Sequence, residues 1–268
     1  MYVDFYKPQS EILSQYIEGF YFMNKNQTYP FQYFTFPNNF CILSLMNNAT
    51  LEIQNNEFFI KKSKNRIQIS SLTYHYKKQL RINYLGPIEE FTIYFKPNAI
   101  NNFVENMIDF YHPKSVESFE PFDDFKKLFF NIFKIKDKTL QIDYIETLLL
   151  SIFKEKKDSL IENLLIDIEG ELSIEKIASK NGISRQYLNQ YFKLKIGKSP
   201  SEYRKISRFR KSLNLFSQQK KSFTEISYDN LFFDQSHFNR DFKAITNLTP
   251  KEFLANTNLD QENIWFII

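Results

Sequence analysis

The stretch FDQSHFNRDF, residues 233–242, has the pattern of a single helix with two different sides. Phe238 and Phe242 stand four positions apart, so they share one side of such a helix. Asp234 precedes them, where a residue that caps a helix N-terminus is expected. The other side is almost wholly polar and rich in hydrogen-bonding groups. We therefore expect a surface helix whose exposed side contacts a polar partner.

A second copy of this pattern lies about fifty residues upstream. Residues 173–203 and 222–253 can be aligned at an offset of 49, which becomes 50 after one inserted residue, Phe233, in the turn. In each copy a short helix is followed by a turn and by a second helix, which begins at Ser184 or Asp234. A Ser-Pro or Thr-Pro pair then starts the next helix, because Pro suits a first helical turn. This plan predicts two helix-turn-helix units, in which the second helix enters the DNA major groove.

The second helix of each copy separates apolar from hydrogen-bonding residues. Leu188 and Phe192 form the apolar side in the first copy, and Phe238 and Phe242 form it in the second. The polar sides consist of amides, hydroxyls, imidazole and guanidinium groups: Arg185, Gln186, Asn189, Gln190, Gln235, Ser236, His237, Asn239 and Arg240. Amides can pair with adenine at two places, and Arg can do so with guanine. An ordinary solvated face would more often be rich in Lys and Glu, so this pattern favours contact with base edges.

Charge is unevenly distributed along the chain. Residues 170–256 contain 16 Lys and Arg against 8 Asp and Glu, whereas residues 1–169 contain 19 against 21. The basic excess therefore belongs to the part of the chain that contains the repeat, which indicates a polyanionic partner there.

The first 95 residues have a different periodicity. From about residue 19 to residue 95, short aromatic and β-branched segments alternate with polar breaks, which predicts an antiparallel sandwich or a cupin-like barrel. After Pro97 the apolar spacing becomes helical, over 98–110, 121–134 and 140–157. The helices at 121–134 and 140–157 could pack on their own sheet or form a dimer seam.

The predicted fold class is therefore α+β, with an N-terminal β-rich domain plus helices and then an all-α domain with two helix-turn-helix units. The predicted boundaries are 1–157, 158–256 and a tail at 257–268. Residues 74–78, YHYKK, form a polar and aromatic cluster that we interpret as a surface loop or a pocket mouth.

Several functional classes have no support in the sequence. With 5 Gly, the chain has no P-loop or dinucleotide-binding glycine motif. The single cysteine, Cys41, lies in an apolar run and is interpreted as a core residue. His75 and His112 are far apart, so we expect no metal site, no cofactor and no catalytic activity. Neither a signal peptide nor an apolar run of ~20 residues is present, so we expect a cytoplasmic protein without membrane contact.

The repeat resembles the DNA-binding domain of AraC/XylS-type transcription regulators. The stretches LSIEKIASKNGISRQYLNQYFK (172–193), GKSPSEYRKISRFRKSLNLF (197–216) and EISYDNLFFDQSHFNRDFKAITNLTPKEF (225–253) carry this resemblance, which covers about 158–256. It implies two helix-turn-helix units, joined by a long helix at about 200–217, that read adjacent major-groove segments. Successive turns of the groove lie ~34 Å apart.

The resemblance also assigns roles by position. It implies base-reading roles for Gln186, Asn189, Gln190, Gln235, Ser236, His237 and Arg240. Candidate phosphate contacts, which position a protein without specifying sequence, are Arg185, Lys193, Lys198, Arg204, Arg208, Lys243 and Lys251.

This sequence departs from the family pattern at three positions. Gln190 stands where many members have Arg. Leu231 replaces the turn glycine that matches Gly182, and a branched residue disfavours positive φ. Asn247 replaces another glycine, and Asn is the most tolerant substitute there.

We therefore predict a sequence-specific regulator of transcription that binds double-stranded DNA. The N-terminal domain would bind a small-molecule effector, form a homodimer, or do both, and RNA polymerase is a further candidate partner. The alternative is an effector- or partner-binding module with weakened DNA binding, for which Leu231 and Gln190 are the best support.

Overall fold

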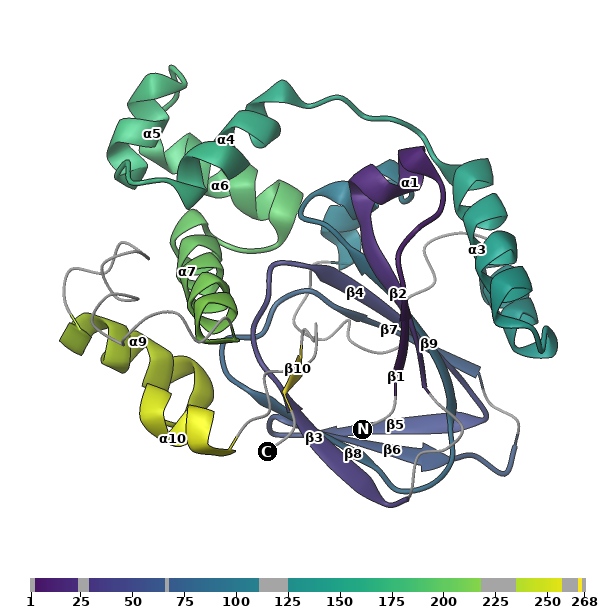
Figure 1. Cartoon of the computed structure of the whole chain (residues 1–268). Coiled ribbons are helices and arrows are strands. Elements are labelled where there is room, and N and C mark those ends of the chain that lie inside the picture. Colours follow the sequence, from purple (N-terminus) through teal and green to yellow (C-terminus); the bar gives the residue numbers. More distant parts are fainter. Residues whose placement is uncertain are drawn as a thin grey trace. The chain divides into compact units, whose positions relative to one another are not determined.

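A computed structural model describes residues 3–23, 29–65, 68–110, 125–217, 235–256 and 265–266. The chain divides into two compact units. Unit 1 contains residues 1–31, 40–74 and 83–157, and unit 2 contains residues 32–39, 75–82 and 158–268. Both units are drawn in Figure 1, and each is described separately below.

Two five-stranded sheets make up the β-rich part of the protein (Figure 1). The first sheet has the order β1 (Val3–Tyr6), β2 (Ile17–Met23), β9 (Glu89–Phe95), β4 (Cys41–Asn47) and β7 (Gln68–Thr73), and its strands are antiparallel. The second has the order β10 (Trp265–Phe266), β3 (Phe31–Thr35), β8 (Leu80–Tyr84), β6 (Glu57–Lys62) and β5 (Ala49–Gln54). Strands β3 and β8 each have residues in both units. The predicted β-rich N-terminal part is confirmed.

The core of unit 1 is largely aromatic, as a chain with 30 Phe and 16 Tyr requires. Phe20 on β2 and Phe91 on β9 are both fully buried, with ring centroids 5.9 Å apart. Three helices contribute to the same core: α1 (Glu11–Tyr16), α2 (Phe125–Phe130) and α3 (Lys138–Ile152). Helix α3 buries Ile142, Ile145 and Leu149 there. This side of α3 therefore packs within its own unit. Cys41 is also a buried core residue, as predicted.

Residues 98–110 do not form the predicted helix. Two 3₁₀ segments, η1 (Ala99–Asn102) and η2 (Met107–Phe110), lie there instead. Asn98 and Asn106 have φ of 64° and 54°, which a continuing right-handed helix does not allow. In the second predicted helix, α2 passes directly into η3 (Asn131–Lys134).

The helices that the structure describes after residue 157 belong to unit 2. They are α4 (Ser159–Glu169), α5 (Ile174–Lys180), α6 (Arg185–Ile196), α7 (Pro200–Ser217), α9 (Gln235–Thr246) and α10 (Pro250–Asn256). The long helix predicted at about 200–217 is therefore present as α7. Residues 218–234 lie outside the described residues.

The Ser-Pro and Thr-Pro pairs begin helices by the same mechanism. The Ser199 hydroxyl accepts from the Glu202 N–H at 3.3 Å, and the Glu202 carboxylate accepts from the Ser199 N–H at 3.0 Å. Thr249 and Glu252 repeat both bonds, at 3.3 and 2.7 Å. These reciprocal capping boxes satisfy N–H groups that have no partner inside a helix. The sequence repeat is thus also a repeat of local structure.

No helix among the described residues is long and apolar enough to cross a membrane.

Candidate nucleic-acid interface

The first helix-turn-helix unit is built from α5, a short turn and α6. The Ser173 hydroxyl begins α5 by accepting from the Lys176 N–H at 3.2 Å. The Ser184 hydroxyl begins α6 by accepting from the Tyr187 N–H at 3.1 Å, as predicted. Between the helices, Gly182 has φ of 67°, a conformation that disfavours residues with a side chain. The turn therefore fixes where α6 starts.

Helix α6 presents two chemically different sides. Leu188 and Phe192 are fully buried in a core that also contains Ile161, Ile177 and Tyr203. Gln186 and Gln190 are exposed. The predicted division of this helix into an apolar and a polar side is therefore present in the structure.

Two further polar residues of α6 already have partners within the unit. Asn189 is half-buried, and its amide donates to the Arg185 carbonyl at 2.8 Å. The Arg185 guanidinium pairs with Glu175 at 2.8 Å, and both side chains are mostly exposed. Such an exposed ion pair contributes little to stability.

Tyr187 was not among the residues that the sequence predicted to contact DNA. It lies on α6 with 47% of its surface exposed, and its ring stacks on Tyr191 with centroids 5.6 Å apart. Helical spacing from Gln186 and Gln190 places Tyr187 beside the polar side, and this signal was available in the sequence.

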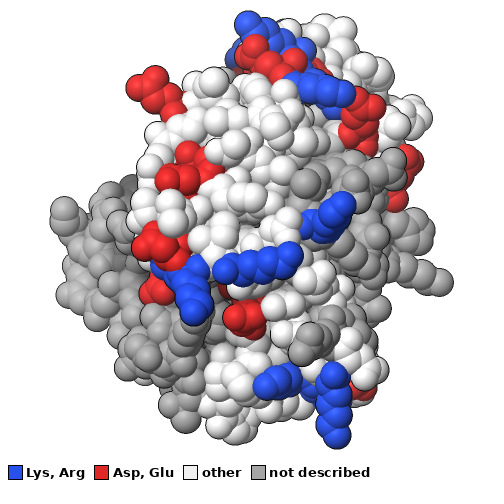
Figure 2. Space-filling model, turned by 90° about the vertical axis from the view of Figure 1, so that its right-hand side faces the viewer, with Lys and Arg blue, Asp and Glu red and all other residues white. Residues whose placement is uncertain are grey.

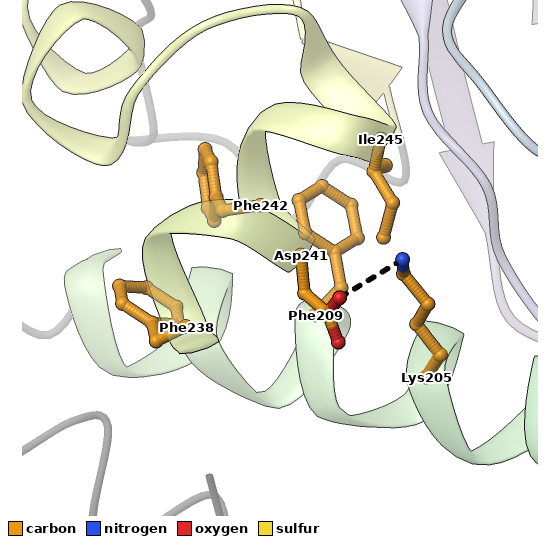
Figure 3. Close-up of a pocket in the computed structure, with 6 residues that line it drawn as sticks. All are labelled: Lys205, Phe209, Phe238, Asp241, Phe242 and Ile245. Carbon is orange, nitrogen blue, oxygen red and sulfur yellow. Dashed lines mark hydrogen bonds and ion pairs between the residues drawn. The ribbon is translucent and has the colours of Figure 1, made fainter. Parts of the chain in front are cut away.

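Helix α9 is anchored by aromatic packing on α7. Phe238 and Phe242 are buried, and the Phe242 and Phe209 ring centroids are 5.2 Å apart. Figure 3 shows this contact, together with the ion pair at its edge between Lys205 and Asp241, whose N–O distance is 3.1 Å. The apolar side of α9 is thus fixed against α7.

The polar side of α9 carries the residues predicted to read bases. Gln235, Ser236 and Arg240 are exposed, and His237 is half-buried. The His237 Nε2 lies 3.4 Å from Asp241, one helical turn away. The predicted cap Asp234 and the unusual Leu231 and Phe233 lie outside the described residues.

The end of α9 repeats the end of α6. Asn247 has φ of 59°, and Gly197 has φ of 75° at the matching position. In both, the N–H donates to the carbonyl four residues back, Lys243 or Lys193, at 2.9 Å. Asparagine therefore takes the left-handed conformation in place of glycine, as we expected from the sequence.

The predicted phosphate contacts fall into two groups. Four of them are exposed: Arg185, Lys193, Lys243 and Lys251. The other three are not: Lys198, Arg204 and Arg208.

The surroundings of these last three side chains differ from those of the exposed cations. Lys198 is 1% exposed, so its ammonium is not presented to a ligand in this structure. Arg204 donates to the carbonyls of Ile168 and Leu172 at 2.7 and 2.6 Å, which ties α7 to the end of α4. Arg208 is half-buried, and burial lowers the pKa of its guanidinium although the nearby Asp241 opposes this. A count of basic residues in the sequence cannot separate such structural cations from exposed ones.

One face of the molecule carries charges of both signs. On the face shown in Figure 2, Lys and Arg are interspersed with Asp and Glu. Among the described residues, no group of three or more His, Cys, Asp or Glu is arranged to hold a metal ion.

Comparison with known proteins gives a family match to the C-terminal region. A family described as a helix-turn-helix domain matches residues 177–256. Two relatives are the uncharacterized HTH-type transcriptional regulators YtdP of Bacillus subtilis and YidL of Escherichia coli. YtdP is 24% identical over 58% of this chain and 22% of its own length, and YidL is 31% identical over 38% and 34%. The chain therefore spans only a fifth to a third of these relatives.

Solved structures give further similarities. ToxT from Vibrio cholerae covers 88% of this chain and 96% of its own, with 14% identity and a TM-score of 0.47. A Chromobacterium violaceum transcriptional regulator, titled as having an AraC-type DNA-binding domain, covers 39% of this chain and 91% of its own. It has 30% identity and a TM-score of 0.33.

The capped helix pair and the family match define residues 177–256 as a helix-turn-helix domain, the class of DNA-binding module found in transcription regulators. This match agrees with the sequence resemblance to AraC/XylS-type DNA-binding domains. The match supports DNA binding by this domain.

Proposed function

We propose that the protein is a sequence-specific, double-stranded DNA-binding regulator that reads two adjacent major-groove segments with α6 and α9. One observation carries this proposal. Both helices bury their paired apolar residues while their opposite sides expose amide, hydroxyl or guanidinium groups. Such groups form the bidentate contacts that distinguish one base pair from another.

The two helices would contribute different chemistry. Gln186, Asn189 and Gln190 on α6 are all amides, which suit adenine. On α9, Gln235, Ser236 and His237 add hydrogen-bonding groups, and Arg240 adds a guanidinium that suits guanine. Because guanidinium–guanine pairs are the commonest specific contact, we expect α9 to supply the stronger base contact.

Phosphate contacts would come from the exposed cations only. Arg185 and Lys193 lie on α6, Lys243 lies on α9, and Lys251 lies on α10. Each phosphate that they neutralise would add about −0.9 to the slope of log K against log salt. The proposed interface therefore has fewer cations than the sequence indicates.

For the remainder of the chain we propose what the family resemblance implies. The β-rich part would respond to an effector, support a homodimer, or do both. RNA polymerase is a candidate partner at a promoter. We propose no catalytic activity.

The experiment is selection of DNA duplexes from a random pool by the purified chain, followed by binding titrations on the selected and on scrambled duplexes. Arg240→Ala should weaken binding to the selected duplex by ~1–3 kcal/mol and leave scrambled DNA nearly unchanged. Lys243→Ala is the matched control on the same helix, and it should weaken binding to both duplexes equally. Capture of duplexes with no common sequence would refute the proposal.

The second candidate function is an effector- or partner-binding module with weakened DNA binding. The surroundings of Lys198, Arg204 and Arg208 favour it, because Lys198 is buried and the two arginines are half-buried, which leaves fewer exposed cations for phosphates. This function predicts that the purified chain retains no duplex at low salt, where non-specific binding is strongest.

A further inference from the structure

Two segments from the N-terminal half belong to the unit that contains the helix-turn-helix helices. They are residues 32–39 and 75–82. Phe36 is fully buried in one hydrophobic cluster with Phe209 of α7, Phe242 of α9 and Phe253 of α10. Its ring centroid lies 5.1 Å from that of Phe253 and 6.3 Å from that of Phe209. The core that anchors α9 is therefore completed by a residue some two hundred positions away.

Polar contacts hold the backbone on both sides of Phe36. Arg210 of α7 donates to the Phe36 carbonyl and, at 2.8 Å, to the Pro37 carbonyl. The Tyr76 hydroxyl donates to the same Phe36 carbonyl at 2.6 Å. The Asn39 amide donates to the Ser207 hydroxyl at 2.7 Å and to the Tyr203 carbonyl at 3.1 Å. Because each bond satisfies a partly buried polar group, these contacts fix the position of the backbone around Phe36.

The segment 75–82 supports the end of α9 directly. The Gln79 N–H donates to the Ile245 carbonyl at 3.0 Å. Ile245 lies in the last turn of α9, where carbonyls have no partner inside the helix. The residues that the sequence pattern placed in a surface loop or pocket mouth, 74–78, therefore include the half-buried Tyr76, whose hydroxyl contacts the Phe36 carbonyl.

The first helix-turn-helix unit is built differently. The buried residues of the core around Leu188 and Phe192 run from Ile161 to Tyr203, so every one of them comes from the C-terminal part of the chain. Of the two cores that anchor α6 and α9, as far as the structure describes them, only the α9 core contains a buried apolar residue from before position 158.

We infer that Phe36, held by Arg210, is a positioning residue for DNA reading by α9, whereas the buried apolar residues that position α6 all come from the C-terminal part of the chain. The effect on DNA reading rests on the proposed function, whereas the positioning of α9 by Phe36 does not. This positioning makes Phe36 a point at which a change in the N-terminal half acts on the buried core of α9 and not on that of α6.

The test uses the full chain and has two readouts. The first is amide hydrogen exchange of α9 and α6, which needs no DNA. In Phe36→Ala the amides of Phe238–Thr246 should exchange at least ~10-fold faster, and those of Leu188–Ile196 should not change. Leu188→Ala is the matched control in the other core and should give the opposite pattern. Phe36→Leu, which keeps most of the apolar contact, should restore slow exchange in α9.

The second readout is discrimination on the selected duplex with base substitutions in one half or the other. Phe36→Ala should lose about tenfold of its discrimination in the half read by α9 and none in the other half. If the wild-type chain selects no duplex, the proposed function fails while the exchange result still decides this inference. Should Phe36→Ala fail to fold, Arg210→Lys takes its place, because a Lys ammonium lacks the planar fork whose two nitrogens hold the Phe36 and Pro37 carbonyls. Equal acceleration in α6 and α9, or none in α9, would overturn the inference.

Discussion

Replacement of Asp158 should loosen the first helix-turn-helix unit without touching any DNA-reading residue. The Asp158 side chain begins α4 by accepting from the Ile161 N–H at 3.2 Å. It also accepts from the Tyr191 hydroxyl at 2.6 Å and pairs with Lys195 at 2.8 Å. Tyr191 and Lys195 both lie on α6, so a single carboxylate joins the start of α4 to the helix proposed to read DNA.

The expected cost of Asp158→Ala follows from these contacts. Loss of an N-cap costs ~1 kcal/mol. A hydrogen bond to a charged group is worth about 1.5–3 kcal/mol. The partly exposed pair with Lys195 adds about 0.5 kcal/mol. Since all three share one carboxylate and are not additive, we expect a loss of about 3 kcal/mol.

Asp158→Asn separates these contributions. Asparagine caps helices as well as aspartate does, and its amide oxygen can still accept from Tyr191. It loses the charge and the second acceptor oxygen, which pairs with Lys195, so the expected cost is about 1 kcal/mol. Tyr191→Phe, alone and combined with Asp158→Ala, completes a double-mutant cycle that isolates the hydroxyl–carboxylate bond.

Hydrogen exchange of the α4 and α6 amides is the suitable assay, because a chain with two units need not unfold in one transition. Asp158→Ala should accelerate exchange in α4 and α6 and leave α3 of unit 1 unchanged. A change below about 0.5 kcal/mol in Asp158→Ala, or an equal effect of Asp158→Asn, would refute the reasoning.

Three further predictions concern pH, a helix end and salt. Burial raises the pKa of Glu202, but Lys77, Ser199 and His75 outweigh this and bring it to about 2, below its usual 4.5. The stabilisation by the ionised Glu202 carboxylate is therefore complete above pH 4.5 and is lost as the pH falls toward 2. In acid unfolding, Glu202→Gln should lack this pH-dependent stabilisation, which is worth ~1–2 kcal/mol after screening. Asn247→Ala should destabilise α9 by ~1 kcal/mol in thermal unfolding and Asn247→Gly should not, because Asn247 is left-handed; equal stabilities would contradict this. Lys193→Ala should reduce the salt slope of DNA binding by ~0.9, whereas the buried Lys198→Ala should change stability and leave the slope unaltered; the opposite result would place Lys198 on a phosphate.

Local chemistry explains why much of unit 2 could be predicted. Ser184 before an apolar spacing of four predicts a helix start, and the hydroxyl does cap α6. The second Ser/Thr-Pro pair predicts another, and Thr249 caps α10 through a box with Glu252. Caps, turns and helical periodicity depend on residues that lie within a few positions of each other. They can therefore be predicted from a single sequence. The same reasoning failed at 98–110, where two asparagines take positive φ that apolar spacing does not reveal.

The candidate site was predicted in composition but not in detail. Exposed amides on α6 and the exposed Arg240 on α9 follow from helix spacing alone. Lys198, Arg204 and Arg208 fit the same charge pattern, yet their burial depends on which helix packs on which.

The sequence by itself determined the repeat, its caps and the polar sides of the second helices, because these features arise from contacts a few residues apart. Only the tertiary structure decided that Phe36 completes the core under α9 and that Asp158 binds Tyr191. Both contacts join residues that are distant in the chain, and their free energy depends on burial and on the distance between two atoms. Those quantities exist only once the chain has folded.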